Sequence, residues 1–437
     1  MKVALLNPPW TFEHSIYFGC RAPHLPIELG ASKTLLEQAG HRTLMRDGLL
    51  DELDIAGMAE ACTGFAPDLI VVTTAPTYLF WRCAQPELRL PRMLLDALRL
   101  ACPRATLVAV GPHGSATPDA ALRKLGADVV VRGECEETVL ALANGGVPGE
   151  VPGTAVLQPD GSLRANGGPQ ATRFTDLPAM RWPDHWVARH HHHHHRFEQP
   201  DEGSGHDLPG AEVEASRGCP YSCSFCAKID FRDSYRRRDL APLLEEIDAL
   251  RAQGVGYLYF IDEIFLPNRP LLEALVGRGL KFGVQTRIDL WKPDMLELLG
   301  RAGCVSIEAG VESLTEAGRA ELDKNCKLST DELADRLIMA KQHVAFVQAN
   351  LIQVSGDDPA MVTAWRERLL TAGVWANDPV PLYPYPSSPD YRKLFGLPDA
   401  QAWERAHAHY LGLFDRMSDI QDDTPLPLAE LESVCRC

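Results

Sequence analysis

The chain has 437 residues, of which 45% are hydrophobic and 23% charged, and its formal net charge is −16. This length favours two domains with connectors, and the composition is typical of a globular protein. The acidic balance argues against broad nucleic-acid binding, and the sequence contains no run of about eighteen apolar residues that could cross a membrane. The start, MKVALLNPPW, passes directly into prolines, so we expect a first strand instead of a signal peptide, and a soluble cytoplasmic protein.

Strand and helix signals alternate over residues 1–150. Short runs of aliphatic and β-branched residues predict four strands, at 2–7, 68–74, 106–111 and 127–133. Helices are expected between them, in IELGASKTLLEQAG, which Gly40 closes, and in LPRMLLDALRLAC, which Pro91 opens. This alternation predicts an α/β fold with a doubly wound, Rossmann-like, mostly parallel sheet, whose ligands would bind beyond the carboxyl ends of the strands.

Residues 151–210 are expected to connect two domains. VPGTAVLQPDGSLRANGG has the turn residues of a β-hairpin around PDG. A stretch rich in Pro, Gly and His follows, and it includes six consecutive histidines, His190 to His195. We interpret this run as a polar loop between domains, with binding of a divalent metal as the alternative.

Over residues 211–385 the alternation resumes at a longer period. Six strands are predicted, at 210–216, 256–262, 281–287, 304–310, 344–352 and 374–382. Helical patterns such as LAPLLEEIDALRAQG and STDELADRLIMAKQ lie between them. Six such units are fewer than the eight of a complete barrel, so we predict a partial (β/α)6 barrel. Residues 386–437 predict a short helical cap at the C-terminus.

Three of the twelve cysteines lie close together in SRGCPYSCSFCAKIDFRD, directly after the first barrel strand. Without a secretory signal these thiols should be reduced, and the spacing Cys219-x3-Cys223-x2-Cys226 then predicts a metal or redox site. A structural zinc site needs four closed ligands, and no second CxxC pair follows. Three thiolates on an iron–sulfur cluster leave one iron open to another ligand, which makes the cluster the preferred interpretation and zinc the alternative.

This motif resembles the signature of the radical S-adenosylmethionine (SAM) enzymes, in which an aromatic residue, here Phe225, precedes the third cysteine. The resemblance implies a [4Fe-4S] cluster on the three cysteines and SAM at the open iron. It also implies contacts to SAM from YFIDEIF, QTRIDLW and SIEAGVES, at the ends of the next three strands. The implied residues are Asp262 and Glu263 for the SAM amino group, Gln285 and Arg287 for its carboxylate, and Glu308 for its ribose. Taken singly, each could instead form a salt bridge or a solvated charge at the rim.

In this family, one electron from the cluster cleaves SAM to methionine and a 5′-deoxyadenosyl radical. The radical removes hydrogen from an unactivated C–H bond, while the protein positions the reactants and excludes water. The resemblance therefore implies a flavodoxin- or ferredoxin-type electron donor as a partner.

Residues 1–150 resemble the cobalamin-binding domain that precedes many radical SAM barrels, most closely in GPHGSATP and GADVVVRGECEETVLAL. Three features depart from that domain. Pro112 stands where a second glycine is usual, and the D-x-H-x-x-G motif is absent. The end of the preceding strand carries bulky aromatic residues, Tyr78, Phe80 and Trp81. The departures favour a vestigial domain without cobalamin. His113 could serve as an axial ligand, although a histidine at a helix start or in a loop is the commoner case.

GAEVEASRGCPYSCSFCAK, FVQANLIQ and PVPLYPYPSSPDYRKLFG are similar to radical SAM proteins of sugar and antibiotic pathways, in particular to diol dehydratases of aminoglycosides such as paromamine in apramycin biosynthesis. The resemblance implies hydrogen abstraction from an amino sugar and loss of water. A separate NADPH-dependent reductase could then reduce the keto product. Proton transfer needs an acid/base group. Candidates are Glu214, Tyr221, Asp357 and Asp358, and Gln348 and Asn350 could bind sugar hydroxyls, since alternate residues share one face of a strand.

Two other functions stay open. One is a cobalamin-dependent radical SAM methyltransferase that acts on carbon. The other is a cluster-bearing scaffold protein without catalysis. The complete set of SAM-site residues in the expected order favours an enzyme.

Overall fold

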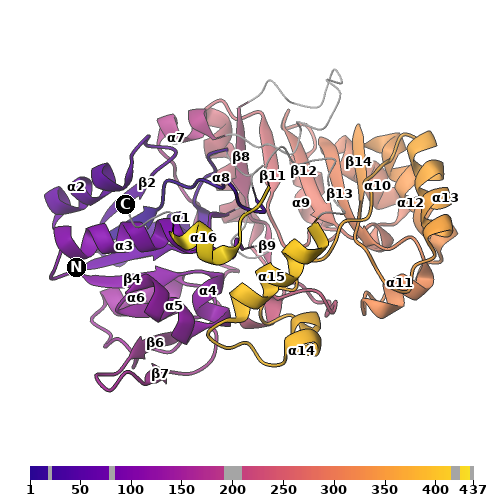
Figure 1. Ribbon diagram of the computed structural model, residues 1–437. Coiled ribbons are helices and arrows are strands. Elements are labelled where there is room, and N and C mark those ends of the chain that lie inside the picture. The colour runs from indigo at the N-terminus through magenta and orange to yellow at the C-terminus, as the bar shows by residue number, and fades with distance from the viewer. Residues whose placement is uncertain (18–21, 78–83, 191–208, 415–423, 434–437) are drawn as a thin grey trace. The chain divides into compact units, whose positions relative to one another are not determined.

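The computed structural model describes residues 1–17, 22–77, 84–190, 209–414 and 424–433. The chain divides into two compact units (Figure 1). Unit 1 comprises Met1–Arg189, Cys226–Ser234 and Tyr383–Cys437, and unit 2 comprises His190–Phe225 and Tyr235–Leu382. Unit 1 is therefore assembled from three separate stretches of the chain.

Unit 1 contains a seven-stranded sheet in the order β2-β1-β3-β4-β5-β6-β7. Its strands are β1 (Lys2–Asn7), β2 (Arg42–Asp47), β3 (Leu69–Thr73), β4 (Thr106–Val110), β5 (Val129–Val131), β6 (Thr154–Leu157) and β7 (Leu163–Ala165). The first five are parallel, and β6 and β7 form the antiparallel hairpin predicted around PDG. The pattern does not predict β2, because RTLMRD mixes charged and apolar residues and only Met45 and Asp47 are buried.

The described part of unit 1 also contains helices. They are α1 (Ile27–Gln38), α2 (Ile55–Phe65), α3 (Arg89–Ala101), α4 (Pro112–Ala116), α5 (Pro118–Leu125), α6 (Glu136–Ala143), α7 (Asp184–Arg189), α14 (Pro389–Phe395), α15 (Ala402–Phe414) and α16 (Leu428–Ser433). Asp54 caps α2 by accepting a hydrogen bond from the Gly57 N–H, and prolines open α4 and α5, where a backbone N–H has no partner. Helix α3 begins at Arg89, before the predicted Pro91.

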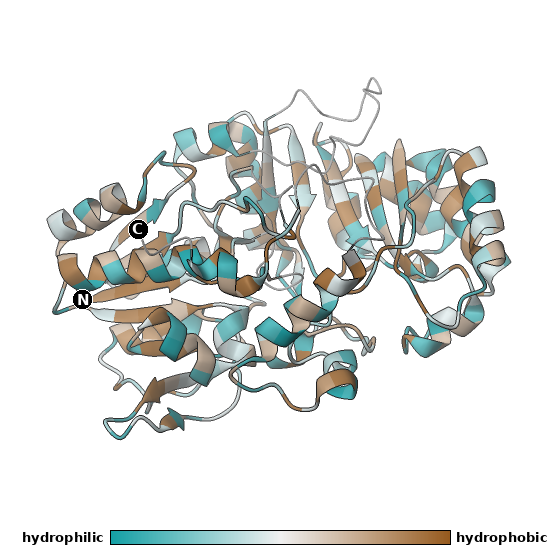
Figure 2. Cartoon of the chain, in the orientation of Figure 1, coloured by the Kyte–Doolittle hydropathy of each residue, from teal (hydrophilic) through white to brown (hydrophobic). Residues whose placement is uncertain are grey.

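The core of unit 1 lies between the strands and the helices. Strands β3 and β5 are buried at every position, which explains why they read as continuous aliphatic runs in the sequence. Leucines from α3 and α5 pack on the alanines, valines and isoleucine of β1, β3 and β4. The strands are coloured mainly as hydrophobic, whereas the helices carry both hydrophilic and hydrophobic residues (Figure 2).

Unit 2 contains six parallel strands that follow chain order across the sheet (Figure 1). They are β8 (Gly210–Val213), β11 (Tyr257–Phe260), β12 (Lys281–Thr286), β13 (Cys304–Glu312), β14 (Phe346–Leu351) and β15 (Trp375–Ala376). Each overlaps a predicted strand, although β15 covers only two residues of the predicted 374–382 and β13 extends beyond the predicted 304–310. The described strands β8 and β15 are the two edges, so the sheet is open and does not close into a barrel. A short ribbon, β9 (Ser216–Arg217) with β10 (Arg236–Arg237), flanks the cysteine motif.

The helices of unit 2 alternate with its strands. They are α8 (Leu240–Ala252), α9 (Arg269–Leu275), η4 (Ile288–Leu290), α10 (Pro293–Arg301), α11 (Glu316–Glu321), α12 (Thr330–His343) and α13 (Pro359–Thr371), while η3 (Lys228–Asp230) belongs to unit 1. A capping box, in which Ser329 and Glu332 bond to each other's backbone N–H, fixes the start of α12. The predicted α/β class, with a Rossmann-like unit, a partial barrel and C-terminal helices, is confirmed. No described helix has the length and apolar character needed to span a bilayer.

Candidate active site

The cysteine motif lies in the loop after β8 and β9, at the carboxyl end of the first strand of unit 2. Cys219 and Cys223 are half-buried and form no disulfide, as is also true of Cys226. Gly218 has φ of 76°, a left-handed conformation that suits glycine, and its N–H donates to Glu263 Oε2 at 2.7 Å. Farther along, the Ser224 N–H donates to the Leu322 carbonyl at 3.0 Å. The loop is thus tied to the segment after β11 and to the C-terminal end of α11.

The donor set of this loop fits an iron–sulfur cluster. It supplies three reduced thiols, and thiolate is the usual protein ligand of such clusters. Burial raises the pKa of the Cys223 thiol, and the ammonium group of Lys324 opposes that effect. Cys226 starts the segment Cys226–Ser234, which packs with unit 1, whereas the other two cysteines belong to unit 2.

Asp262 and Glu263 follow β11 and contact the approach to this loop. Asp262 is buried and accepts hydrogen bonds from the Ala215 N–H at 2.8 Å and from the Ser216 hydroxyl. Burial raises the pKa of Asp262 to about 7. Both of its oxygens therefore brace the chain between β8 and the cysteines. In contrast to the buried Asp262, Glu263 is half-buried.

Gln285 and Arg287 end β12. The Arg287 guanidinium forms a two-point ion pair with Asp289, with Nε at 3.1 Å from Oδ1 and Nη2 at 2.8 Å from Oδ2. Its central carbon lies 4.0 Å from the centre of the Tyr221 ring, inside the cysteine motif. Arg287 Nη1 and Gln285 Oε1 are buried and have no hydrogen-bond partner among the described residues. This strand end therefore presents an unused donor and an unused acceptor.

Strand register brings three of the predicted residues into one row. Gln285 of β12 lies beside Glu308 of β13, which lies beside Gln348 of β14. Neighbours in register point to the same face of a sheet, so the three side chains form a polar row, called here the inner row. Glu308 is 8% exposed and accepts a hydrogen bond from the Tyr259 hydroxyl at 3.3 Å. Asn350, two residues beyond Gln348, shares that face and accepts a hydrogen bond from it.

Glu308 does not lie at the strand end. The sequence predicts that the strand stops at Gly310, but β13 continues to Glu312 through a register shift. Glu312 has φ of 65°, and its Oε1 accepts a hydrogen bond from Lys324 Nζ at 2.7 Å. The sequence analysis did not single out Glu312 or Lys324. A charged residue that directly follows an apolar strand was the available signal for Glu312.

Three of the four acid/base candidates are engaged in contacts of their own. Glu214 is buried with Arg217, whose Nε and Nη2 lie 2.9 and 2.7 Å from Glu214 Oε2. Asp357 accepts hydrogen bonds from the Ser313 and Thr315 hydroxyls. Asp358 is exposed and caps α13 through the Ala360 N–H. The fourth candidate, Tyr221, lies under the Arg287 guanidinium, and burial raises its pKa. Phe225, the aromatic residue of the motif, is half-buried.

His113 lies in α4 of unit 1 and is fully buried. Its Nε2 is 2.7 Å from the Gln85 carbonyl, its Nδ1 is 3.1 Å from the Thr74 hydroxyl, and its ring lies 4.5 Å from that of Trp403. Burial lowers the pKa of His113 to about 3, so the ring is neutral. Because both nitrogens are bonded inside unit 1, His113 is not presented as an axial ligand.

A second network closes the ends of β1, β2 and β3. Asn7 donates to Asp47 and accepts from Trp10 Nε1 at 2.8 Å and from the Thr73 hydroxyl at 2.7 Å. The hollow beside it measures about 10 Å³, and the one beside Pro112 and Trp403 about 20 Å³. Each has room for roughly one water molecule. Neither of these two hollows has room for a corrin macrocycle. Tyr78, Phe80, Trp81 and His191 to His195 lie outside the described residues.

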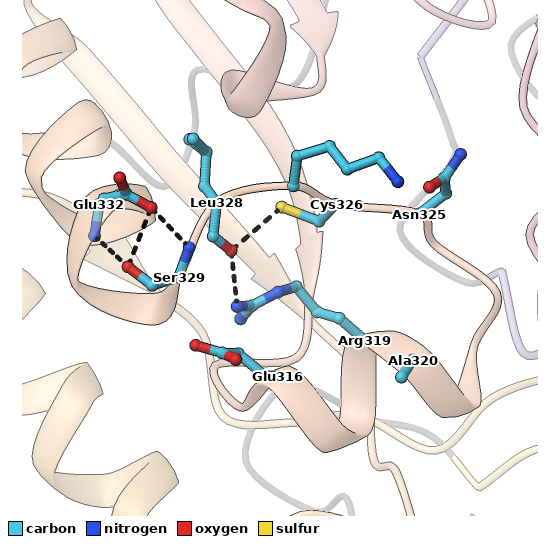
Figure 3. Close-up of a pocket in the computed structure, with 9 residues that line it drawn as sticks. Glu316, Arg319, Ala320, Asn325, Cys326, Leu328, Ser329 and Glu332 are labelled. Carbon is cyan, nitrogen blue, oxygen red and sulfur yellow. Dashed lines mark hydrogen bonds between the residues drawn. The ribbon is translucent and has the colours of Figure 1, made fainter.

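A larger hollow of about 580 Å³ opens between α11 and α12 of unit 2 (Figure 3). The Arg319 guanidinium and the Cys326 thiol both point to the Leu328 carbonyl at its wall. None of the residues predicted for the active site lines this hollow. It is separate from the row and the loop described above.

The sequence of this chain is similar to those of several known proteins. Residues 213–359 match the family model of the Radical SAM superfamily. An uncharacterized methyltransferase of Pyrococcus horikoshii is 23% identical over 323 residues, which are 72% of this chain and 66% of the relative. Anaerobic magnesium-protoporphyrin IX monomethyl ester cyclase of Cereibacter sphaeroides is 27% identical over 325 residues, which are 70% of this chain and 49% of the relative. The chain thus spans about half to two thirds of these relatives.

A solved structure has the same fold. It is the radical S-adenosylmethionine methyltransferase TsrM from Kitasatospora setae with cobalamin and a [4Fe-4S] cluster bound, with a TM-score of 0.70 and 18% identity. The likeness covers 89% of this chain and 76% of that one. Neither this structure nor the two relatives is named for action on an amino sugar.

Proposed function

We propose that this chain is a radical SAM enzyme that methylates a carbon atom of a small polar molecule, because residues 213–359 match the model of the Radical SAM superfamily, whose members use a [4Fe-4S] cluster and SAM. The observation that carries the proposal is the likeness to a methyltransferase over 89% of the chain, which includes both units. The name of the Pyrococcus horikoshii relative agrees with it.

Residues of the cysteine loop and of the end of β12 would bind the cluster and SAM. Cys219 and Cys223, with Cys226, would hold the cluster, which when bound supplies the electron that cleaves SAM. Arg287 Nη1 and Gln285 Oε1, both without partners among the described residues, would bind the carboxylate and amino groups of SAM. Glu263 would fix the start of the cysteine loop by accepting a hydrogen bond from the Gly218 N–H.

Two members of the inner row, Glu308 and Gln348, would bind the substrate, beside the SAM ligand Gln285. Gln285, Glu308 and Gln348 line one face of the sheet at the same height, and amides and a carboxylate there can bond hydroxyl or ammonium groups. Glu308 is the charged member of this row, and it is buried, so a cationic group on the substrate would gain a poorly screened partner. A polar, hydroxylated amine fits this chemistry.

A second candidate is dehydration of an amino sugar such as paromamine without cobalamin. The small size of the two hollows at the strand ends of unit 1 supports it, because neither has room for a corrin macrocycle. The names of the relatives support methyl transfer better than dehydration. Within the second candidate, Tyr221 stays as the acid/base group, since Glu214, Asp357 and Asp358 bond their neighbours. The keto product would then go to an NADPH-dependent reductase.

One experiment separates the two reactions. The full chain is purified from cells grown with cobalamin, its cluster is reconstituted without oxygen, and it is incubated with SAM, dithionite and paromamine. Bound corrinoid in the visible spectrum, with a methylated product and S-adenosylhomocysteine, supports methyl transfer and overturns dehydration. A corrinoid-free protein that yields 5′-deoxyadenosine and a product that has lost water overturns methyl transfer. Reduced protein with a full cluster that never cleaves SAM overturns both. A flavodoxin or ferredoxin can replace dithionite as the electron donor.

A further inference from the structure

A buried ion pair lies at the end of β13 in unit 2. Glu312 ends the strand, and Lys324 reaches it from the turn after α11, with Nζ at 2.7 Å from Oε1. Lys324 is 3% exposed. Moving two charges out of water is unfavourable unless each is well paired, so the geometry of such a pair has to be held closely.

The backbone on both sides holds the pair. Glu312, Asp323 and Asn325 have φ of 65°, 49° and 51°, a left-handed conformation that non-glycine residues adopt rarely. A Cβ at Gly310 would lie 3.0 Å from Glu312 Oε1, so a glycine there leaves space for the carboxylate to fold back along the strand. Such conformations persist where the surroundings fix them, and they gather at functional sites.

The segment before Lys324 contacts the cysteine loop. The Ser224 N–H, next to Cys223, donates to the Leu322 carbonyl at 3.0 Å, two residues before Lys324. This contact brings the segment that carries Lys324 against the residue next to Cys223.

We propose that Lys324 is a positioning residue for the cluster, and that its ammonium group, held by Glu312, stabilises the negative charge that the cluster gains on reduction. The step is the transfer of one electron from an external donor, a flavodoxin, a ferredoxin or dithionite, to the cluster on Cys223. A fixed positive charge nearby raises the reduction potential, because it lowers the energy of the more negative state. The inference rests on the proposed cluster site and is independent of the reaction that follows SAM cleavage.

The test is a redox titration of the reconstituted full chain, followed by the electron paramagnetic resonance signal of the reduced cluster. Lys324→Met removes the positive charge, and the midpoint potential should fall. The double variant Lys324→Arg, Glu312→Gln removes the carboxylate but keeps a cation that does not lose its proton, and the potential should rise. If the pair only shapes the loop, the two variants will shift the potential in the same direction or leave it unchanged.

Two controls make the result decisive. Lys281→Met removes a half-buried lysine at the amino end of β12, the opposite end from the cysteine loop, and should leave the potential unchanged. Iron content and circular dichroism show that each variant holds a cluster and is folded. A wild-type chain that binds no cluster overturns the proposed function together with this inference. A loaded cluster without the opposite shifts overturns the inference alone.

Discussion

At the carboxyl ends of its strands, unit 1 bonds the His113 ring to the Thr74 hydroxyl and to the backbone carbonyl of Gln85, while Gln85 Oε1 is buried without a partner among the described residues. In unit 2, Gln285 and Arg287 end β12, and each keeps a buried polar atom without a partner among the described residues. Both sheets are parallel at these ends, and the general rule for α/β proteins places ligands at both. The comparison teaches that topology provides the position of a site, whereas the side chains there decide what can bind: the spare donor of unit 2 belongs to a charged guanidinium, and the His113 ring of unit 1 is bonded at both nitrogens.

Loss of the cluster should give the largest effect. In Cys223→Ala, we expect formation of 5′-deoxyadenosine from SAM to fall to background and the visible absorbance of the cluster to disappear, because three thiolates are needed to hold it. Circular dichroism should show that the fold survives. Cys304→Ala, which alters a buried thiol of β13, is the matched control and should keep both signals. Full SAM cleavage by Cys223→Ala would show that the cysteine motif is not part of the active site.

Arg287 tests whether the open end of β12 binds SAM. Arg287→Lys keeps the charge but removes the planar fork, so the spare donor beside the Asp289 pair is lost. We expect about 10- to 100-fold weaker binding of SAM to the cluster-loaded chain, the range for losing one hydrogen bond to a charged group. Isothermal titration calorimetry measures it. Arg269→Lys, at an exposed ion pair of α9, should bind SAM normally. Equal affinity in both variants would contradict the assignment.

Burial of His113 in unit 1 should make the free energy of unfolding depend on pH. The pKa of His113 is about 3 in the folded chain, below its ordinary value of about 6.5, so the unfolded chain binds the extra proton between these values. The contribution of His113 to stability is complete above that ordinary value and is lost as the pH falls. From pH 7 to pH 4, the stability advantage of wild type over His113→Gln should shrink by about 3 kcal/mol. Urea unfolding at several pH values measures it.

Asp47 provides a control of opposite sign. Burial raises its pKa to about 7, so the folded chain binds the extra proton over the same pH range. The advantage of wild type over Asp47→Asn should therefore grow as the pH falls from 7 to 4. A slope of the same sign for both variants would show that the two groups are not buried as the structure describes.

The smallest effect is expected at Asp358. It is exposed and caps α13 through the Ala360 N–H, so Asp358→Ala should lower the free energy of unfolding by about 1 kcal/mol. Thermal unfolding measures this change. SAM cleavage and product formation should stay at the wild-type rate, whereas a large loss of activity in a folded variant would restore Asp358 as an acid/base candidate.

The strands could be predicted because burial leaves a direct trace in the sequence. LVAV at 107–110 and YLYF at 257–260 are aliphatic or aromatic without interruption, and both are buried in strands. Strand β2 leaves no such trace, since an edge strand can carry arginine and threonine. The cysteine spacing likewise specified the place of the loop. Local patterns were enough for these features.

Contacts across the sheet could not be predicted. The inner row depends on register between strands, and a shift at Gly310 moved the end of β13 to Glu312. Asp357 looked available at a strand end, but its partners Ser313 and Thr315 precede it by 44 and 42 residues. Which polar group is already bonded is a property of the packed chain, and local sequence does not encode it.

The assembly of unit 1 from three stretches of chain has a consequence for biosynthesis. The Trp403 indole donates to the Thr117 hydroxyl across 286 residues, and its ring also covers His113. A ribosome would release most of unit 1 long before it makes Trp403, although chains generally begin to fold from the N-terminus. The nascent unit must therefore remain incomplete while unit 2 is translated. Agents that act on partly made chains, such as chaperones and proteases, would meet the His113 side of this sheet uncovered.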